Sequence, residues 1–140
     1  MCHESLIDFP VVITVPLLWG DHDAFGHVNN LVYLRWCETA RVEYFMRIGL
    51  WPALPPAGVG PILASISCDY KRPLTFPDTA YIGARVTRIG NRSFQMQHRV
   101  VSRALAAVAA SKTAPSLLHL ALFFVGAFAM RGADKKQCEM

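Results

Sequence analysis

One long helix pattern dominates the sequence and limits the folds open to it. Apolar side chains recur with helical spacing over residues 30–48, and either Asn29 or Asn30 can cap the first turn. Gly49 followed by Leu50 is typical of a C-terminal cap, and Pro52 marks the stop. Because the apolar residues form more than one stripe, we expect the helix to be buried on most sides.

The other apolar segments predict strands. Residues 9–19 are rich in β-branched side chains, and Pro16 within them indicates an edge position or a bulge. Residues 62–70 predict a second strand. Residues 80–89 and 93–102 predict a hairpin joined by a Gly90-Asn91 turn, and residues 104–110 can extend its last strand. At 140 residues the chain suits one domain, so we expect an α+β fold with one long helix on a curved antiparallel sheet.

The C-terminal part departs from this pattern. Residues 114–130 are almost wholly apolar, and Lys112 and Arg131 flank them. The segment is slightly short for a membrane span. It suits either a strand or helix packed on the sheet, or a segment at a membrane surface. We therefore expect a folded domain over residues 1–110 and an atypical apolar C-terminal tail over residues 111–140, a divergent or altered end of the same domain.

Composition and cysteine spacing give no sign of several classes of protein. The net charge is +4, but the positive residues are scattered, whereas a nucleic-acid-binding protein more often shows a basic patch. The four cysteines form no C-x-x-C pair, so zinc and redox motifs are absent from the sequence. We also find no secretory signal pattern. Free thiols and a cytoplasmic location are therefore the expectation.

The loop before the helix contains the candidate catalytic residues. Residues 21–33 read D-H-D-A-F-G-H-V-N-N-L-V-Y, which puts carboxylates, a glycine and a histidine next to a helix start. Amides of the first helical turn lack internal partners and lie at the positive end of the helix dipole. They can stabilise an oxyanion while a nearby carboxylate acts as base or nucleophile. The amides of Asn30, Leu31 and Val32 are the candidate donors.

Three blocks of sequence resemble a known family. They are Trp19–Asn30 (W-G-D-H-D-A-F-G-H-V-N-N) with Tyr33 and E-T-A-R at residues 38–41, D-Y-K-R-P-L at residues 69–74, and R-I-G-N-R-S at residues 88–93. Over residues 10–110 the chain resembles the hotdog-fold acyl-CoA thioesterases, most closely the 4-hydroxybenzoyl-CoA thioesterase and YbgC-like branch. The resemblance implies a helix wrapped by an antiparallel sheet, dimers or tetramers with active sites between subunits, and metal-free hydrolysis of an acyl-CoA. No cofactor is implied, because coenzyme A belongs to the substrate. The tail lacks the further strand pattern usual in the family.

The resemblance and the residues together give a set of site predictions. The acid of the family falls on Asp23, whose structural alternative is an Asx turn. His27 is expected to orient water, although a loop histidine is more often only hydrogen-bonded. Asp21 is expected to bind loop amides. Contacts with the acyl group or its carbonyl are expected from Gly26, Val28, Asn29, Asn30, Leu31, Val32 and Tyr33. Contacts with the phosphates of coenzyme A are expected from Lys71, Arg72, Arg88, Arg92 and Ser93.

Other residues and functions stay open as alternatives. Glu38 is a rival acid but is expected to pair with Arg41 on the same helix face. Trp36 and Cys37 are expected to be core residues. The alternative functions are a hotdog enoyl-thioester hydratase or dehydratase that uses Asp23 and His27, and a non-catalytic protein that binds thioesters or a membrane.

Overall fold

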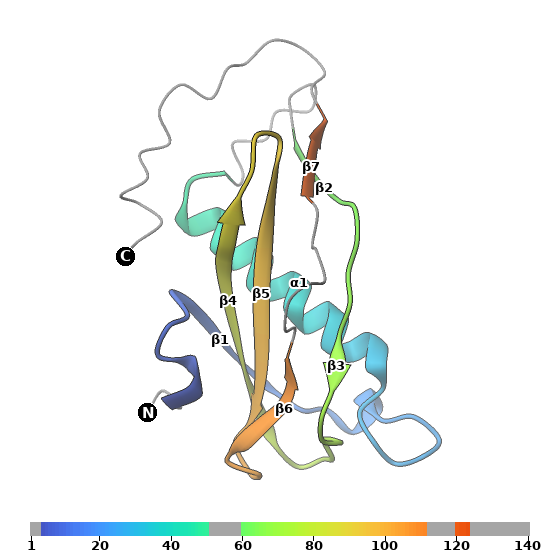
Figure 1. Cartoon of the computed structure of the whole chain (residues 1–140). Coiled ribbons are helices and arrows are strands. Elements are labelled where there is room, and N and C mark those ends of the chain that lie inside the picture. The colour runs from blue at the N-terminus through green and yellow to red at the C-terminus, as the bar shows by residue number, and fades with distance from the viewer. Residues whose placement is uncertain (1–3, 51–59, 112–119, 124–140) are drawn as a thin grey trace.

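The computed structural model describes residues 4–50, 60–111 and 120–123, in which one α-helix lies against an antiparallel sheet (Figure 1). Two short 3-10 helices lie near the N-terminus, η1 (Glu4–Leu6) and η2 (Trp19–Asp21). The helix is α1 (Asn30–Arg47). The strands are β1 (Val11–Pro16), β2 (Gly60–Leu63), β3 (Asp69–Tyr70), β4 (Thr79–Ile89), β5 (Ser93–Ser102), β6 (Ala107–Ser111) and β7 (Leu120–Phe123).

The helix has the predicted ends. Asn29 is the N-cap, and its side chain accepts a hydrogen bond from the Leu31 amide at 2.9 Å. Gly49 follows the last turn with φ of 72°, a conformation that favours glycine, and the Leu50 amide bonds to the Phe45 carbonyl at 2.9 Å. Sequence chemistry at the two ends thus sets the length of α1.

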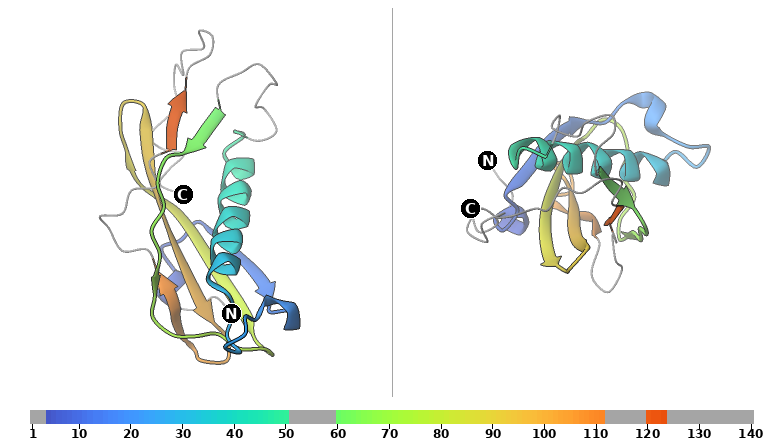
Figure 2. Two further views of the ribbon diagram at one scale, coloured as in Figure 1. Left: turned by 90° about the vertical axis from the view of Figure 1, so that its right-hand side faces the viewer. Right: turned by 90° about the horizontal axis from the view of Figure 1, so that it is seen from above.

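The predicted burial of α1 on most sides is wrong. One face lies against the sheet, mainly on β4 and β1, and Figure 2 shows the helix lying across that face. The opposite face is exposed even where it is apolar, as at Leu31 and Met46, of which 66% and 51% are accessible. The buried helix residues are Val32, Tyr33, Trp36, Cys37, Ala40, Tyr44 and Phe45. Trp36 and Cys37 are therefore core residues, as predicted.

The sheet follows the order β1-β4-β5-β6-β3, with β2 and β7 off this path. β1 lies at one end of that order, so its predicted edge position is confirmed, and β4 and β5 form the predicted hairpin. Register shifts between Val86 and Arg88 and between Val100 and Val101 interrupt the pairing and help the sheet to curve. The helix wrapped by a curved antiparallel sheet that the hotdog resemblance implied is confirmed.

Two strand predictions need correction. Residues 62–70 do not form one strand: β2 ends at Leu63, and β3 is a two-residue strand that pairs with β6. Residues 104–110 do not extend β5, because the chain turns at residues 103–106 and β6 runs back along β5. Ala106 has φ of 46° in that turn, a conformation that a sequence pattern for strands does not reveal.

A second, smaller apolar cluster covers the outer face of the sheet. The N-terminal segment (residues 4–10) puts Leu6 and Phe9 against Val101, away from the main core beneath α1. Both side chains are almost fully buried. The sheet is therefore covered on both faces, by α1 on one side and by the N-terminal segment on part of the other.

Part of the atypical tail joins the sheet. Residues 120–123 form β7, which pairs antiparallel with β2 and also with the end of β5 at Ser93 and Phe94. Of the alternatives left open for the apolar segment, a strand that joins the sheet is the one observed at these residues. The rest of the predicted apolar segment lies outside the described residues, as does most of the proposed 111–140 unit. In the described part of the chain, no helix is both long and apolar enough to cross a membrane.

Candidate functional site

Asp21 fastens the loop between β1 and α1. Its carboxylate, 6% exposed, accepts hydrogen bonds from the Leu18 amide and from the Arg35 guanidinium, each at 2.9 Å. Its carbonyl oxygen accepts a bond from the Asn29 amide at 2.8 Å. Because all three oxygens are engaged, Asp21 holds the loop in place, and its predicted bonding to a loop amide is confirmed.

Asp23 lies in a tight turn that uses only part of its carboxylate. The Phe25 amide donates to Asp23 Oδ1 at 2.8 Å, which is the Asx turn considered as the structural alternative. The Gly26 amide donates to the Asp23 carbonyl at 3.1 Å, and the φ of 76° at Gly26 favours glycine. Within the described residues, Oδ2 of Asp23 has no hydrogen-bond partner. The turn therefore orients the carboxylate and leaves one oxygen available.

Asn30 contributes the candidate backbone donor at the helix start, and both it and Asp23 line one pocket. In residues 28–32 its amide alone has no acceptor in the described part of the chain. The positive end of the helix dipole adds to its ability to bind an anion. The neighbouring bonds are Val28 N to Leu74 O at 2.9 Å, Asn29 N to Asp21 O at 2.8 Å, Leu31 N to Asn29 Oδ1 at 2.9 Å and Val32 N to Asn29 O at 3.0 Å. The predicted group of three candidate amides is thus reduced to one.

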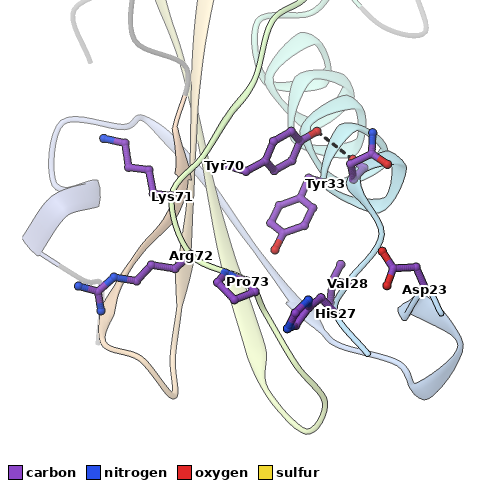
Figure 3. A pocket seen from close by; sticks show the side chains of 9 residues that line it. Asp23, His27, Val28, Tyr33, Tyr70, Lys71, Arg72 and Pro73 are labelled. Carbon is purple, nitrogen blue, oxygen red and sulfur yellow. Dashed lines mark hydrogen bonds between the residues drawn. The ribbon is translucent and has the colours of Figure 1, made fainter. Parts of the chain in front are cut away.

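A pocket of about 340 Å³ lies beside this helix start (Figure 3). Its size is within the range of small-molecule sites, which begins at about 300 Å³. Residues from the loop, α1, β3 and the segment after β3 form its wall. They are Asp23, His27, Val28, Asn30, Tyr33, Tyr70, Lys71, Arg72 and Pro73.

Two tyrosines join the parts of the pocket wall. The rings of Tyr33 and Tyr70 pack edge to face with centroids 5.2 Å apart. The Tyr33 hydroxyl accepts a bond from the Leu74 amide at 3.2 Å, and the Tyr70 hydroxyl donates to the Asn30 carbonyl at 3.2 Å. Burial raises the pKa of both hydroxyls, and neighbouring Cys68 raises that of Tyr70 further. Both tyrosines therefore stay neutral over the ordinary pH range.

The pocket brings together many of the predicted site residues. Asp23, His27 and Asn30, the three predicted catalytic residues, all line it, with Val28, Tyr33, Lys71 and Arg72. Gly26, Asn29, Leu31 and Val32 do not line it and serve the turn and the helix cap instead. Sequence reasoning missed Tyr70 and Pro73, although both lie in the D-Y-K-R-P-L block.

The predicted phosphate-binding cations divide into two groups. The amides of Lys71 and Arg72 both bond to the Ala109 carbonyl, at 2.8 and 3.0 Å, and their side chains extend to the side away from Asp23 (Figure 3). Arg88, Arg92 and Ser93 lie at the tip of the β4–β5 hairpin, at the other end of the sheet from the pocket (Figure 1). One copy of the chain does not bring these two groups together.

The remaining candidate acid has a local partner. Glu38 pairs with Arg41 at 3.5 Å, as predicted, and its side chain is 65% exposed. Glu38 is not part of the pocket wall. The described residues contain no group of three or more histidines, cysteines or acids that could hold a metal ion.

Comparison with known proteins identifies the family of the chain. The family model described as the thioesterase-like superfamily matches residues 17–118, which include the loop, α1 and the β3 turn. The chain belongs to the thioesterase-like superfamily. A protein named THEM6 from Danio rerio is 30% identical over 87 residues, which are 62% of this chain and 43% of that protein. The chain thus spans less than half the length of this relative.

Solved structures of thioesterases share the fold. A thioesterase from Thermus thermophilus, crystallised with coenzyme A and zinc, is 33% identical, and 75% of each chain is covered with a TM-score of 0.63. A gentisyl-coenzyme A thioesterase is 26% identical with a TM-score of 0.64, over 71% of this chain and 82% of that one. The fold is therefore that of known coenzyme A thioesterases.

Proposed function

We propose that this protein hydrolyses an acyl-CoA to a carboxylic acid and free coenzyme A. The observation that carries the proposal is that one pocket contains a carboxylate oxygen of Asp23 and the amide of Asn30, neither of which has a hydrogen-bond partner among the described residues. The carboxylate oxygen can act as a base or nucleophile, and the amide can donate a hydrogen bond to an oxyanion. The coenzyme A bound to the Thermus thermophilus thioesterase supports the choice of carrier.

Two routes fit the acid and the amide. As a base, Asp23 takes a proton from water while the water oxygen bonds to the thioester carbon, and the proton passes to sulfur when the C–S bond breaks. As a nucleophile, Asp23 bonds to that carbon and expels the thiolate, and water then cleaves the mixed anhydride. In both routes the Asn30 amide stabilises the oxyanion. His27, exposed on the pocket wall, can orient the water.

Release of free thiol from a panel of aliphatic and aromatic acyl-CoAs tests the proposal. Asp23→Asn keeps the shape and the Asx turn but removes the charge, so we expect kcat to fall by about 100-fold or more. Asp8→Asn is the matched control, since Asp8 is 76% exposed and outside the pocket wall. Hydrolysis at the wild-type rate by a folded Asp23→Asn protein would exclude the assigned role of Asp23.

The role of the Asn30 amide can be tested through the backbone. Asn30 is the first helical residue, a position at which proline is tolerated because its amide has no helical acceptor. Asn29 has φ of −60° and ψ of 141°, values that a residue before proline adopts readily. We expect Asn30→Pro to lower kcat by about 100-fold, the usual effect of losing an oxyanion donor. Asn30→Ala, which keeps the amide, should remain active if the side chain is not required.

A second candidate reaction uses the same pocket. His27 and Asp23 both line it, and enoyl-thioester hydratases of this fold use an acid and a histidine. Hydration of an enoyl-CoA removes the enoyl absorbance without releasing thiol. An enoyl-CoA added to the panel therefore distinguishes hydration from hydrolysis.

We further propose that the protein works as a dimer or tetramer in which a second copy completes the coenzyme A site. Support comes from the distance of the hairpin cations from the pocket and from exposed apolar side chains on the loop, with 75% of Trp19 and 85% of Phe25 accessible. An inactive Asp23→Asn protein mixed with an inactive Arg88→Ala/Arg92→Ala protein should regain about a quarter of wild-type activity, since half of the random dimers contain one intact site. No recovery, together with a mass of 15.5 kDa in solution, would exclude the shared site.

A further inference from the structure

A hydrogen bond ties the sheet to the first turn of the helix at the candidate site. The Tyr70 hydroxyl donates to the Asn30 carbonyl at 3.2 Å and joins two residues that are 40 positions apart (Figure 3). Tyr70 belongs to β3, a strand of two residues that pairs with β6. The bond therefore connects β3, the last strand in the sheet order, to Asn30, whose amide has no acceptor among the described residues.

The position of the Asn30 amide depends on its neighbours. The amides of Val28 and Asn29 are held by carbonyls of Leu74 and Asp21, and Asn29 holds the next two amides. These contacts fix the chain around Asn30 but do not join the helix start to β3. Tyr70 supplies that link from the opposite wall of the pocket.

The surroundings of Tyr70 allow it to hold the first turn of α1 in position. Its ring packs edge to face on Tyr33, which is 3% exposed and is anchored by the Leu74 amide. Its raised pKa keeps the hydroxyl protonated, so it acts as a neutral donor rather than as a base. Although 46% of the residue is accessible, its hydroxyl is directed at the helix carbonyl.

We propose that Tyr70 is a positioning residue that fixes the distance and direction of the Asn30 amide relative to the Asp23 carboxylate. It acts through the Asn30 carbonyl and does not contact the reacting atoms. The proposal rests on the thioester hydrolysis proposed above. Because the amide is most important when the oxyanion forms, misplacing it should slow the chemical step more than it weakens substrate binding.

Tyr70→Phe removes the hydroxyl and keeps the ring. We expect kcat for acyl-CoA hydrolysis to fall by about fivefold, the equivalent of about 1 kcal/mol, while KM changes by less than about twofold. Tyr81→Phe is the matched control, because Tyr81 lies with the outer cluster of Leu6 and Phe9 on the other face of the sheet. It should leave both constants unchanged.

A measurement without substrate keeps the inference separate from the proposed function. The Asn30 carbonyl belongs to the same peptide unit as the Leu31 amide, so loss of its hydrogen bond should shift the Leu31 amide resonance in a ¹⁵N–¹H spectrum of Tyr70→Phe. An unshifted Leu31 resonance, or an unchanged kcat in an active enzyme, would overturn the role of Tyr70. A wild-type protein that hydrolyses no thioester would instead overturn the proposed function, and the spectrum would still decide whether Tyr70 positions the helix start.

Discussion

Gly83, on the outer face of β4, makes room for the N-terminal segment. A Cβ at this position would lie 2.7 Å from Phe9 Cγ and 2.8 Å from Leu6 Cδ2, closer than real Cβ atoms approach other atoms. Phe9 has little freedom to move, because the guanidinium groups of Arg85 and Arg99 lie 4.9 and 5.1 Å from the centre of its ring. We therefore predict that Gly83→Ala forces the segment away from the sheet.

The expected loss follows from two opposing effects. Gly83 does not have a positive φ, so alanine can adopt its conformation and would by itself stabilise the protein by about 0.4–1 kcal/mol through the unfolded chain. Overpacking against buried side chains costs about 1–3 kcal/mol. Full exposure of Leu6 and Phe9 would cost about 1.5–3 kcal/mol for each side chain, and this cost is the upper limit of the loss in the free energy of unfolding. We expect Gly83→Ala to lower the free energy of unfolding by about 1–2 kcal/mol.

Urea unfolding of four variants (Gly83→Ala, Gly20→Ala, Phe9→Ala and Phe9→Ala/Gly83→Ala) measures this effect. Gly20→Ala is the matched control, since a Cβ there meets no atom within 4 Å. In a Phe9→Ala background the added methyl group has space, so Gly83→Ala should cost much less than in the wild type, and the double-mutant cycle gives the coupling. A Gly83→Ala protein as stable as the wild type would refute the argument that the N-terminal segment packs tightly on Gly83.

Two further predictions concern the helix cap and the tyrosines. Asn29→Ala removes the side-chain acceptor of the Leu31 amide and should lower stability by about 1 kcal/mol, which thermal unfolding measures as a lower Tm. Burial raises the pKa values of Tyr33 and Tyr70 above 10.0, so the folded state holds these protons more tightly than the unfolded chain does. Their contribution to stability is then complete below about pH 10 and declines as the pH rises above it, which urea unfolding at about pH 9 and about pH 11 measures.

The helix and the hairpin could be predicted from sequence because local chemistry determines them. Asn29 and Gly49 have side-chain and backbone preferences that mark the ends of α1, and alternation over residues 93–102 gives β5 with the correct ends. The division of residues 62–70 into two strands depends instead on distant partners, since β3 pairs with β6. A sequence window contains no information on such pairing.

The burial of the helix faces shows a different limit of prediction from sequence. Apolar residues such as Leu31 and Met46 suggested an interior environment, yet both are exposed. Burial depends on which elements lie against each face, and the sheet covers only one face of α1 in this chain. The proposed self-association would account for part of the exposed apolar surface, but the sequence pattern alone does not distinguish the core from a surface between copies.

The part of the candidate site that lies in one short segment could be predicted from sequence. Asp23, His27 and Asn30 are close in sequence, so a motif captures them together. Tyr70 joins them only through the fold, 40 residues from Asn30, and a tyrosine beside a basic turn carried no sign of that contact. The assignment of the hairpin arginines to the same site came from the family resemblance, and a single copy of the chain does not unite them.

In the proposed mechanism, the loop divides structural and reactive roles between neighbouring residues. Asp21 uses both carboxylate oxygens to fasten the loop, and Asn29 uses its side chain and carbonyl to cap the helix. These two residues bind the amides of Leu18, Leu31 and Val32 and the Arg35 guanidinium, and Asp23 takes part in none of these bonds. In the part of the chain that the structure describes, one oxygen of Asp23 and the Asn30 amide at the positive end of the helix have no hydrogen-bond partner. A loop fastened only by Asp23 would have to break its own hydrogen bonds during the reaction, whereas this arrangement holds the reactive groups in place before the substrate arrives.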